Sequence, residues 1–165
     1  MKTREFAYEM REAFAAMRRS DFKQLADLGI PEVLVDHFQM VGVARIKERN
    51  GLYFPDPRGR LAFITPVCVD CASTPETPHP DVFPFIGNLI DLIAWDERMP
   101  DQWRLRTGAA KWLGAIPPQY MDPRPFQIWQ SPLEWLQQRC EGLVPLNNNP
   151  AQLCGITKEH EYAAR

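Results

Sequence analysis

The sequence predicts an α+β fold, with N-terminal helices, a central and mainly antiparallel sheet, and a C-terminal β-α-β unit. Apolar residues recur at helical spacing in residues 1–40, whereas residues 41–115 contain short alternating or β-branched runs bounded by turn residues. Residues 116–146 combine a β-prone run, a helix start signal and a second β-prone run. A chain of 165 residues can bury one ordinary core, so we expect a single domain over 1–146, followed by a tail over 147–165.

Three short helices are expected in the first 40 residues. A stripe of apolar residues recurs at helical spacing between residues 2 and 19, formed by Phe6, Met10, Phe14 and Met17. Ser20-Asp21 can cap a second helix, which continues through Leu28 and ends at Gly29. Pro31 suits the first turn of a third helix that runs to about Met40.

Five later segments have strand character, because they alternate or are continuously apolar and are rich in β-branched and aromatic residues. They are Val43–Ile46, Gly51–Phe54, Arg60–Val67, Asn88–Trp95 and Trp103–Thr107. Turn signals at Asn50-Gly51 and Asp56–Gly59 join the first three into an antiparallel meander. We expect a surface loop over Asp70–Pro84, which contains four prolines, and a short helix over Ala109–Leu113.

The C-terminal unit has the outline of a strand, a helix and a second strand. Phe126–Trp129 is β-prone, and a helix start signal follows it, with Ser131 at N-cap, Pro132 at N1 and Glu134 at N3. Gly142 ends the predicted helix. The apolar residues that follow, 143–146, can form the second strand.

Composition and charge exclude several classes of protein. Hydrophobic residues make up 45% of the chain and charged residues 24%, which is typical of a globular protein rather than a disordered one. The net charge of −2 gives no general affinity for polyanions, so any contact with nucleic acid requires a local basic patch. No apolar run approaches the roughly 20 residues of a membrane span, and the N-terminus lacks the apolar core of a secretory signal. We therefore expect a cytoplasmic protein without a membrane partner, whose four cysteines are reduced.

A basic and aromatic cluster is the first candidate site. It consists of Trp103, Arg104, Arg106 and Lys111. Arg104 and Arg106 project to the same side of a strand, where their guanidinium groups could bind successive phosphates while Trp103 stacks on a base. The alternative interpretation is a solvated strand face whose tryptophans belong to the core.

The spacing of Cys68 and Cys71 is that of half a zinc site. A complete site needs two more ligands, for which His79, Cys140 and Cys154 are the candidates. The alternative interpretation is that these are ordinary thiols at the end of a strand. A redox role is disfavoured, because a proline-rich segment follows instead of a helix N-terminus that would lower the thiol pKa.

No catalytic constellation emerges from the sequence. Ser131 is explained by its capping position and lacks the glycine-flanked turn of a nucleophile elbow. Asp91 and Asp96 are five residues apart on a predicted strand and point to opposite faces, so they form no acid–base pair. The chain also lacks a glycine-rich loop that could hold phosphates.

Taken in order, three segments resemble the start of the catalytic core of bacterial replicative primases and of related phage and plasmid primases. They are GLYFPDPRGRLAFITPV (51–67), NLIDLIAW (88–95) and WRLRTGAAKWLG (103–114). The C-terminal unit, 126–146, resembles the first strand, turn and helix of the Toprim fold that follows in that family. The resemblance covers residues 28–146 and implies that the segment around Trp103 guides single-stranded template.

The resemblance also implies that metal-dependent phosphoryl transfer has been lost. A Toprim site needs a Glu after its first strand and an Asp-x-Asp pair after a later strand to hold Mg²⁺. Gln130 and Ser131 stand where the family has Glu and Gly, and the chain contains no Asp-x-Asp. The leading hypothesis is therefore a non-catalytic, primase-like or Toprim-like protein of a phage or mobile element, which binds single-stranded nucleic acid or a replication protein without a cofactor. The alternatives are a protein-interaction module, such as an inhibitor or adaptor, and a small domain stabilised by structural zinc.

Overall fold

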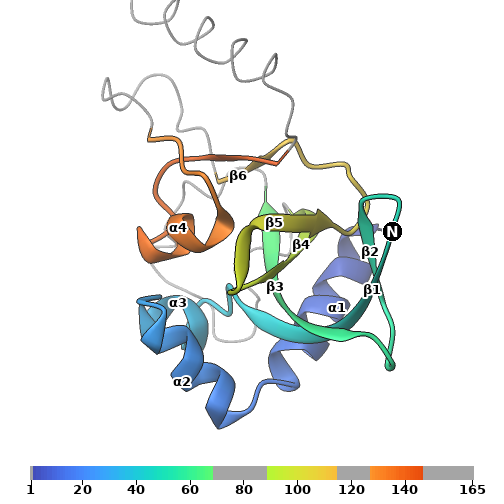
Figure 1. Cartoon of the computed structure of the whole chain (residues 1–165), viewed down its shortest axis with the longest axis horizontal. Helices are drawn as coiled ribbons and strands as arrows, with labels where there is room; N and C mark the ends of the chain where they lie inside the picture. Colours follow the sequence, from blue (N-terminus) through green and yellow to red (C-terminus); the bar gives the residue numbers. More distant parts are fainter. Residues whose placement is uncertain (1, 69–88, 115–126, 147–165) are drawn as a thin grey trace, which may run out of the picture.

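The core of the protein is a strongly curled five-stranded sheet with helices on both sides (Figure 1). The computed structural model describes residues 2–68, 89–114 and 127–146. The helices are α1 (Lys2–Ala15), α2 (Arg19–Asp27), α3 (Glu32–Asp36) and α4 (Pro132–Gln137). The strands are β1 (Gly42–Arg49), β2 (Leu52–Pro55), β3 (Arg60–Cys68), β4 (Leu89–Asp96), β5 (Met99–Leu105), β6 (Trp112–Leu113) and β7 (Val144–Pro145). This arrangement confirms the predicted α+β class.

The main sheet closes into a barrel with the strand order β1-β2-β5-β4-β3. Four of the five pairings are antiparallel, as predicted for the sheet as a whole. The predicted meander of the first three strands is wrong, because β3 pairs with β1 and β4 and not with β2. The barrel is closed by β2 and β5, which run parallel and share a single pair, Leu52 with Leu105. The two short strands β6 and β7 form a separate antiparallel ribbon.

The two faces of the sheet bury two different apolar clusters. Along β3 and β4 the side chains alternate, so that Phe63 and Trp95 belong to one cluster while Ile64 and Ala94 belong to the other. Helix α1 covers the second cluster through its own apolar stripe, which includes Met10. Contact between α1 and the sheet is close, because a Cβ atom added at Gly42 would lie 2.7 Å from the carbonyl carbon of Ala13.

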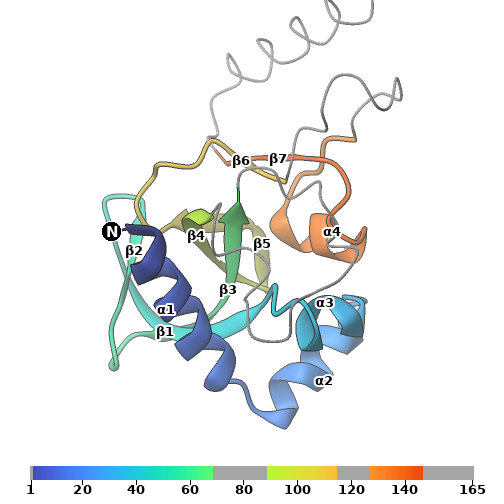
Figure 2. The ribbon, with the colours of Figure 1, turned by 180° about the vertical axis from the view of Figure 1, so that it is seen from behind.

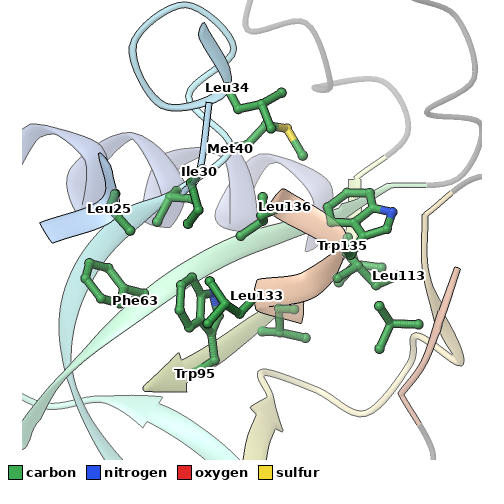
Figure 3. Packing of buried hydrophobic residues seen from close by; sticks show 14 of the residues in the cluster. Leu25, Ile30, Leu34, Met40, Phe63, Trp95, Leu113, Leu133, Trp135 and Leu136 are labelled. Atoms are coloured by element: carbon green, nitrogen blue, oxygen red, sulfur yellow. The ribbon is translucent and has the colours of Figure 1, made fainter. Parts of the chain in front are cut away.

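The first cluster is larger and lies between the sheet and the C-terminal unit (Figure 3). Helices α2, α3 and α4 gather on this side of the molecule, away from the β1–β2 hairpin (Figure 2). Trp95 of the sheet and Trp135 of α4 are both fully buried within it. The side chain of Gln137 donates to the carbonyl oxygen of Leu28 at 2.7 Å, which ties α4 to the end of α2.

The prediction of a helix over Ala109–Leu113 is wrong. The backbone N–H groups of Thr107, Ala109 and Ala110 donate to the carboxylate of Asp91, at distances of 2.8 to 3.2 Å, instead of entering a helical ladder. Gly108 also has a φ of +77°, which interrupts a right-handed helix. The end of the segment pairs as β6.

The N-terminal helices are present, but α1 and α3 are shorter than predicted and α2 begins earlier, at Arg19. Asp21 acts from the third position of α2, where its carboxylate accepts the backbone N–H of Arg18 at 2.6 Å, so Ser20 is not the cap. Pro31 occupies the N-cap of α3, not its first turn. That helix ends well before Met40, since Gln39 takes a positive φ of 50°.

The capping prediction for the C-terminal helix is confirmed. The hydroxyl of Ser131 accepts the backbone N–H of Glu134 at 3.2 Å, and the Glu134 carboxylate accepts the backbone N–H of Gln130 at 2.7 Å. The two strands predicted on either side of this helix pair with each other only through one parallel bridge, between Ile128 and Leu143. Val144 pairs instead with Leu113 of β6. Helix α4 ends at Gln137, ahead of the glycine expected to stop it.

Candidate nucleic-acid interface

Strand β5 carries two of the four predicted residues, Trp103 and Arg104, while Arg106 directly follows the strand and Lys111 precedes β6. Trp103 is half-buried against the larger apolar cluster, and its indole N–H points to the carbonyl oxygen of Leu146 at 3.4 Å. Arg104 and Arg106 alternate with Trp103 and Leu105, so the two arginines lie on the same side, as predicted, and the indole lies on the other. The structure therefore separates the predicted stacking residue from the two predicted phosphate ligands.

Arg104 is part of an ionic network that joins four strands. Its Nε donates to one oxygen of Glu48 at 2.9 Å, and Arg60 donates to the other oxygen. Arg60 also lies 3.6 Å from Asp96. Burial acts to raise the pKa of Glu48, but the hydrogen bonds and charges of Arg60 and Arg104 outweigh it, so this pKa lies below its usual value.

Arg106 fastens helix α1 to the barrel. Its Nε donates to Glu9 at 3.0 Å, while the hydroxyl of Tyr53 donates to the other Glu9 oxygen at 2.9 Å. Burial, followed by the charge of Glu9, raises the pKa of Tyr53 well above its usual value, so the phenol keeps the proton that it donates. The guanidinium carbon of Arg106 also lies 5.6 Å from the centre of the Phe54 ring.

These interactions give both predicted arginines a carboxylate partner. A phosphate that approached either of them would have to compete with Glu48 or Glu9. Lys111 is exposed, and among the described residues its ammonium group has no ion-pair partner. The four residues of the β5 prediction thus do not form one continuous cationic surface.

A second set of cations lies along β1. Arg45, Lys47 and Arg49 occupy alternate positions of this strand, so they project to one side, while Ile46 is buried and Glu48 joins the ionic network on the other side. All three cationic residues are exposed. In both ribbon views the β1–β2 hairpin extends away from α2, α3 and α4 (Figures 1 and 2).

The strand register adds apolar side chains to the same side. In antiparallel pairs, residues directly opposite each other share a face. Phe54 of β2 lies opposite Lys47, and Leu61 of β3 lies opposite Arg45. Phe54 is 40% exposed and Leu61 is 52% exposed. We call the surface formed by Arg45, Lys47, Arg49, Phe54 and Leu61 the basic face.

The positive charge of the basic face is only partly compensated. Arg45 donates to a neutral acceptor, the carbonyl oxygen of Gly59, at 3.0 Å. Lys47 lies 2.6 Å from Asp56, and yet its side chain remains 60% exposed. Within the part of the chain that the structure describes, the side chain of Arg49 has no acidic partner. Three cations and one carboxylate give this surface a local excess of positive charge that the net charge alone does not predict.

The sequence contains a signal for this surface that the prediction did not use. Residues 45–49 read Arg-Ile-Lys-Glu-Arg, in which a cation recurs at every second position. The predicted strand ended at Ile46, whereas β1 continues to Arg49 and places all three cations on one side. What could not be read from the sequence is that Phe54 and Leu61 lie opposite these cations, because that depends on the strand register.

The structure describes some of the candidate zinc ligands and both residues of the Toprim-like turn. Cys68 is buried at the end of β3, whereas Cys71 and His79 lie outside the described residues. In the described ranges, no group of three or more His, Cys, Asp or Glu side chains could hold a metal ion. Ser131 is buried and serves as the cap of α4, and Gln130 is exposed.

None of the helices in the described ranges is both long and apolar enough to span a membrane. Comparison of the chain with protein-family models, with curated proteins and with solved structures gives no match.

Proposed function

We propose that the protein is a non-catalytic module that binds nucleic acid through its basic face. The observation that carries this proposal is the row formed by Arg45, Lys47 and Arg49, which are exposed and lie on one side of β1. Successive cations in such a row lie about 6.5–7 Å apart, as alternate residues of a strand do. A regular row of this kind suits a regularly charged polymer better than a compact anion.

Two further points support nucleic acid and the absence of catalysis. The resemblance of residues 28–146 to primase-core sequences favours a nucleic acid of a phage or mobile element, bound alone or beside a replication protein. In that resemblance the acid of the Toprim turn is replaced by Gln130, and Ser131 is used as a helix cap. An amide and a capping hydroxyl supply neither the carboxylate ligands nor the acid that metal-dependent phosphoryl transfer needs.

The test is fluorescence anisotropy of a labelled oligonucleotide at about 50 and 200 mM salt, with two matched double variants. Lys47→Gln/Arg49→Gln removes two cations from the basic face. Arg4→Gln/Arg11→Gln removes two exposed cations from α1 instead. We expect the first variant to bind about tenfold or more weakly, and its salt dependence to fall by roughly 0.7–0.9 for each phosphate that it no longer neutralises. The second variant should bind like the wild type.

A third double variant, Arg104→Gln/Arg106→Gln, compares the basic face with the strand β5 site. If this variant fails to bind while Lys47→Gln/Arg49→Gln still binds, nucleic acid binds at the site around Trp103 and does not bind at the basic face. If the wild-type protein binds no oligonucleotide at either salt concentration, the proposal is wrong. A protein-interaction module then becomes the leading hypothesis.

A further inference from the structure

We infer that the basic face is a site for single-stranded nucleic acid, in which Phe54 stacks on a base while the β1 cations contact the backbone. This inference rests on the proposed function, since it specifies the ligand of the same surface. It concerns an aromatic residue that the sequence alone does not single out, and it makes a distinction between single strands and duplexes that the charges alone do not make.

The position of Phe54 is suited to stacking. The ring lies directly opposite Lys47 in the β1–β2 ladder and keeps 40% of its surface exposed. The exposed part of the ring is apolar surface that folding leaves in contact with water. A base laid against the ring would remove that surface and would gain the stacking energy that aromatic side chains provide to single strands.

The ring is also supported from within the protein. The guanidinium group of Arg106 lies 5.6 Å from the ring centre, within the range of a cation–π contact. Arg106 is fixed in turn by its 3.0 Å hydrogen bond to Glu9, and Glu9 is held by Tyr53. The Glu9–Arg106 pair therefore holds a cation beside the Phe54 ring.

The geometry of the row favours a flexible single strand over a duplex. The three cations follow one strand over four residue steps, which is about 13 Å, and the aromatic ring lies beside the middle cation. In a duplex the faces of the bases are covered by their neighbours, so Phe54 could reach one only by unstacking it. In a single strand the faces of the bases are accessible, and the backbone can follow the row.

The experiment compares a single-stranded oligo-dT with a duplex of the same length, by anisotropy at about 50 and 200 mM salt. Three variants are used: Phe54→Ala, Phe54→Leu and Tyr8→Ala. Phe54→Leu keeps an apolar side chain but removes the aromatic ring, and Tyr8→Ala removes an exposed aromatic ring from α1, outside the basic face. We expect the wild type to prefer the single strand and both Phe54 variants to weaken that binding about tenfold, with an unchanged salt dependence. Tyr8→Ala should bind like the wild type.

Three outcomes would overturn the inference. Equal or tighter binding of the duplex by the wild type would show that single strands are not preferred, although nucleic-acid binding would stand. Wild-type affinity in Phe54→Leu would show that stacking on the ring is not used. Failure of the wild type to bind either oligonucleotide would overturn this inference together with the proposed function. Circular dichroism of each variant shows whether it is folded.

Discussion

At the scale of single residues, Asp91 is the most constrained group in the described part of the protein. Its carboxylate is fully buried and accepts four backbone N–H groups, from Leu92, Thr107, Ala109 and Ala110. A buried carboxylate is tolerated only when such donors compensate the loss of water. Asp91 therefore has a structural role. Its hydrogen bonds hold residues 107–110 in an ordered turn, and these residues do not form the predicted helix.

Asp91→Asn should destabilise the protein by about 2–4 kcal/mol. The amide keeps the size of the side chain, but it presents an NH₂ group to backbone donors that need an acceptor. Chemical unfolding with urea measures the change in the free energy of unfolding. Asp96→Asn is the control, because Asp96 is partly exposed and its pairing with Arg60 should be worth less than about 1 kcal/mol. Equal effects of the two variants would contradict the role assigned to Asp91.

At the scale of elements, strand β1 serves two purposes at once. Its odd-numbered positions supply the exposed cations Arg45, Lys47 and Arg49, and its even-numbered positions supply buried Ile46 and the network residue Glu48. Glu48 accepts from arginines of β3 and β5, so one carboxylate connects three strands. The basic face thus lies on an element whose other side is fixed by the barrel.

The pH dependence of stability should report on Glu48. Because its pKa is lowered in the folded state, its stabilising contribution is complete above the usual carboxyl pKa and is lost as the pH falls through the lowered value. The contribution should stay below about 1 kcal/mol, since solvent screens a side chain that is one-third exposed.

Urea unfolding of the wild type and of Glu48→Gln between pH 6 and acidic pH tests this expectation. The difference in stability between the two proteins should be largest near pH 6 and should shrink on acidification. A difference that stays constant over this range would mean that the network depends on packing and not on the charge of Glu48.

At the scale of the whole molecule, the two apolar clusters lie on opposite sides of one sheet. Adjacent residues of the same strand enter different clusters, as Phe63 and Ile64 of β3 do. Because the same strands contribute side chains to both clusters, the loss of these strands from the sheet would expose both clusters to water. Helix α1 on one side and the unit of α2, α3 and α4 on the other therefore stabilise each other through the sheet.

We expect the described core to unfold in a single cooperative transition. Tryptophan fluorescence reports on the larger cluster, in which Trp95 and Trp135 are fully buried, and far-UV circular dichroism reports on helices and strands throughout. The two signals should change at the same urea concentration. A fluorescence change that precedes the loss of secondary structure would show that the C-terminal unit separates from the sheet first.

The parts of the fold that the sequence predicted correctly are those set by neighbouring residues. The Ser131 cap depends on a spacing of three residues and is found in the structure. The predicted apolar stripe is found in part, since Phe6 and Met10 of α1 are buried in the second cluster, whereas Met17 lies beyond the helix and packs against the first. The pairings that were missed join residues far apart in the chain, such as Glu9 with Arg106 and Glu48 with Arg104. No local spacing indicates that a carboxylate on α1 or β1 will meet an arginine near the end of β5.

The link between Glu9 and Arg106 has a consequence for the order in which the chain can assemble. During synthesis α1 is made before the strands on which it packs, which include β4, and Arg106 comes 97 positions after Glu9. Until those residues leave the ribosome, the apolar side of the helix remains exposed and can self-associate or bind a chaperone. Helix α1 thus precedes the sheet in synthesis but cannot be held in place until β4 and Arg106 have been made.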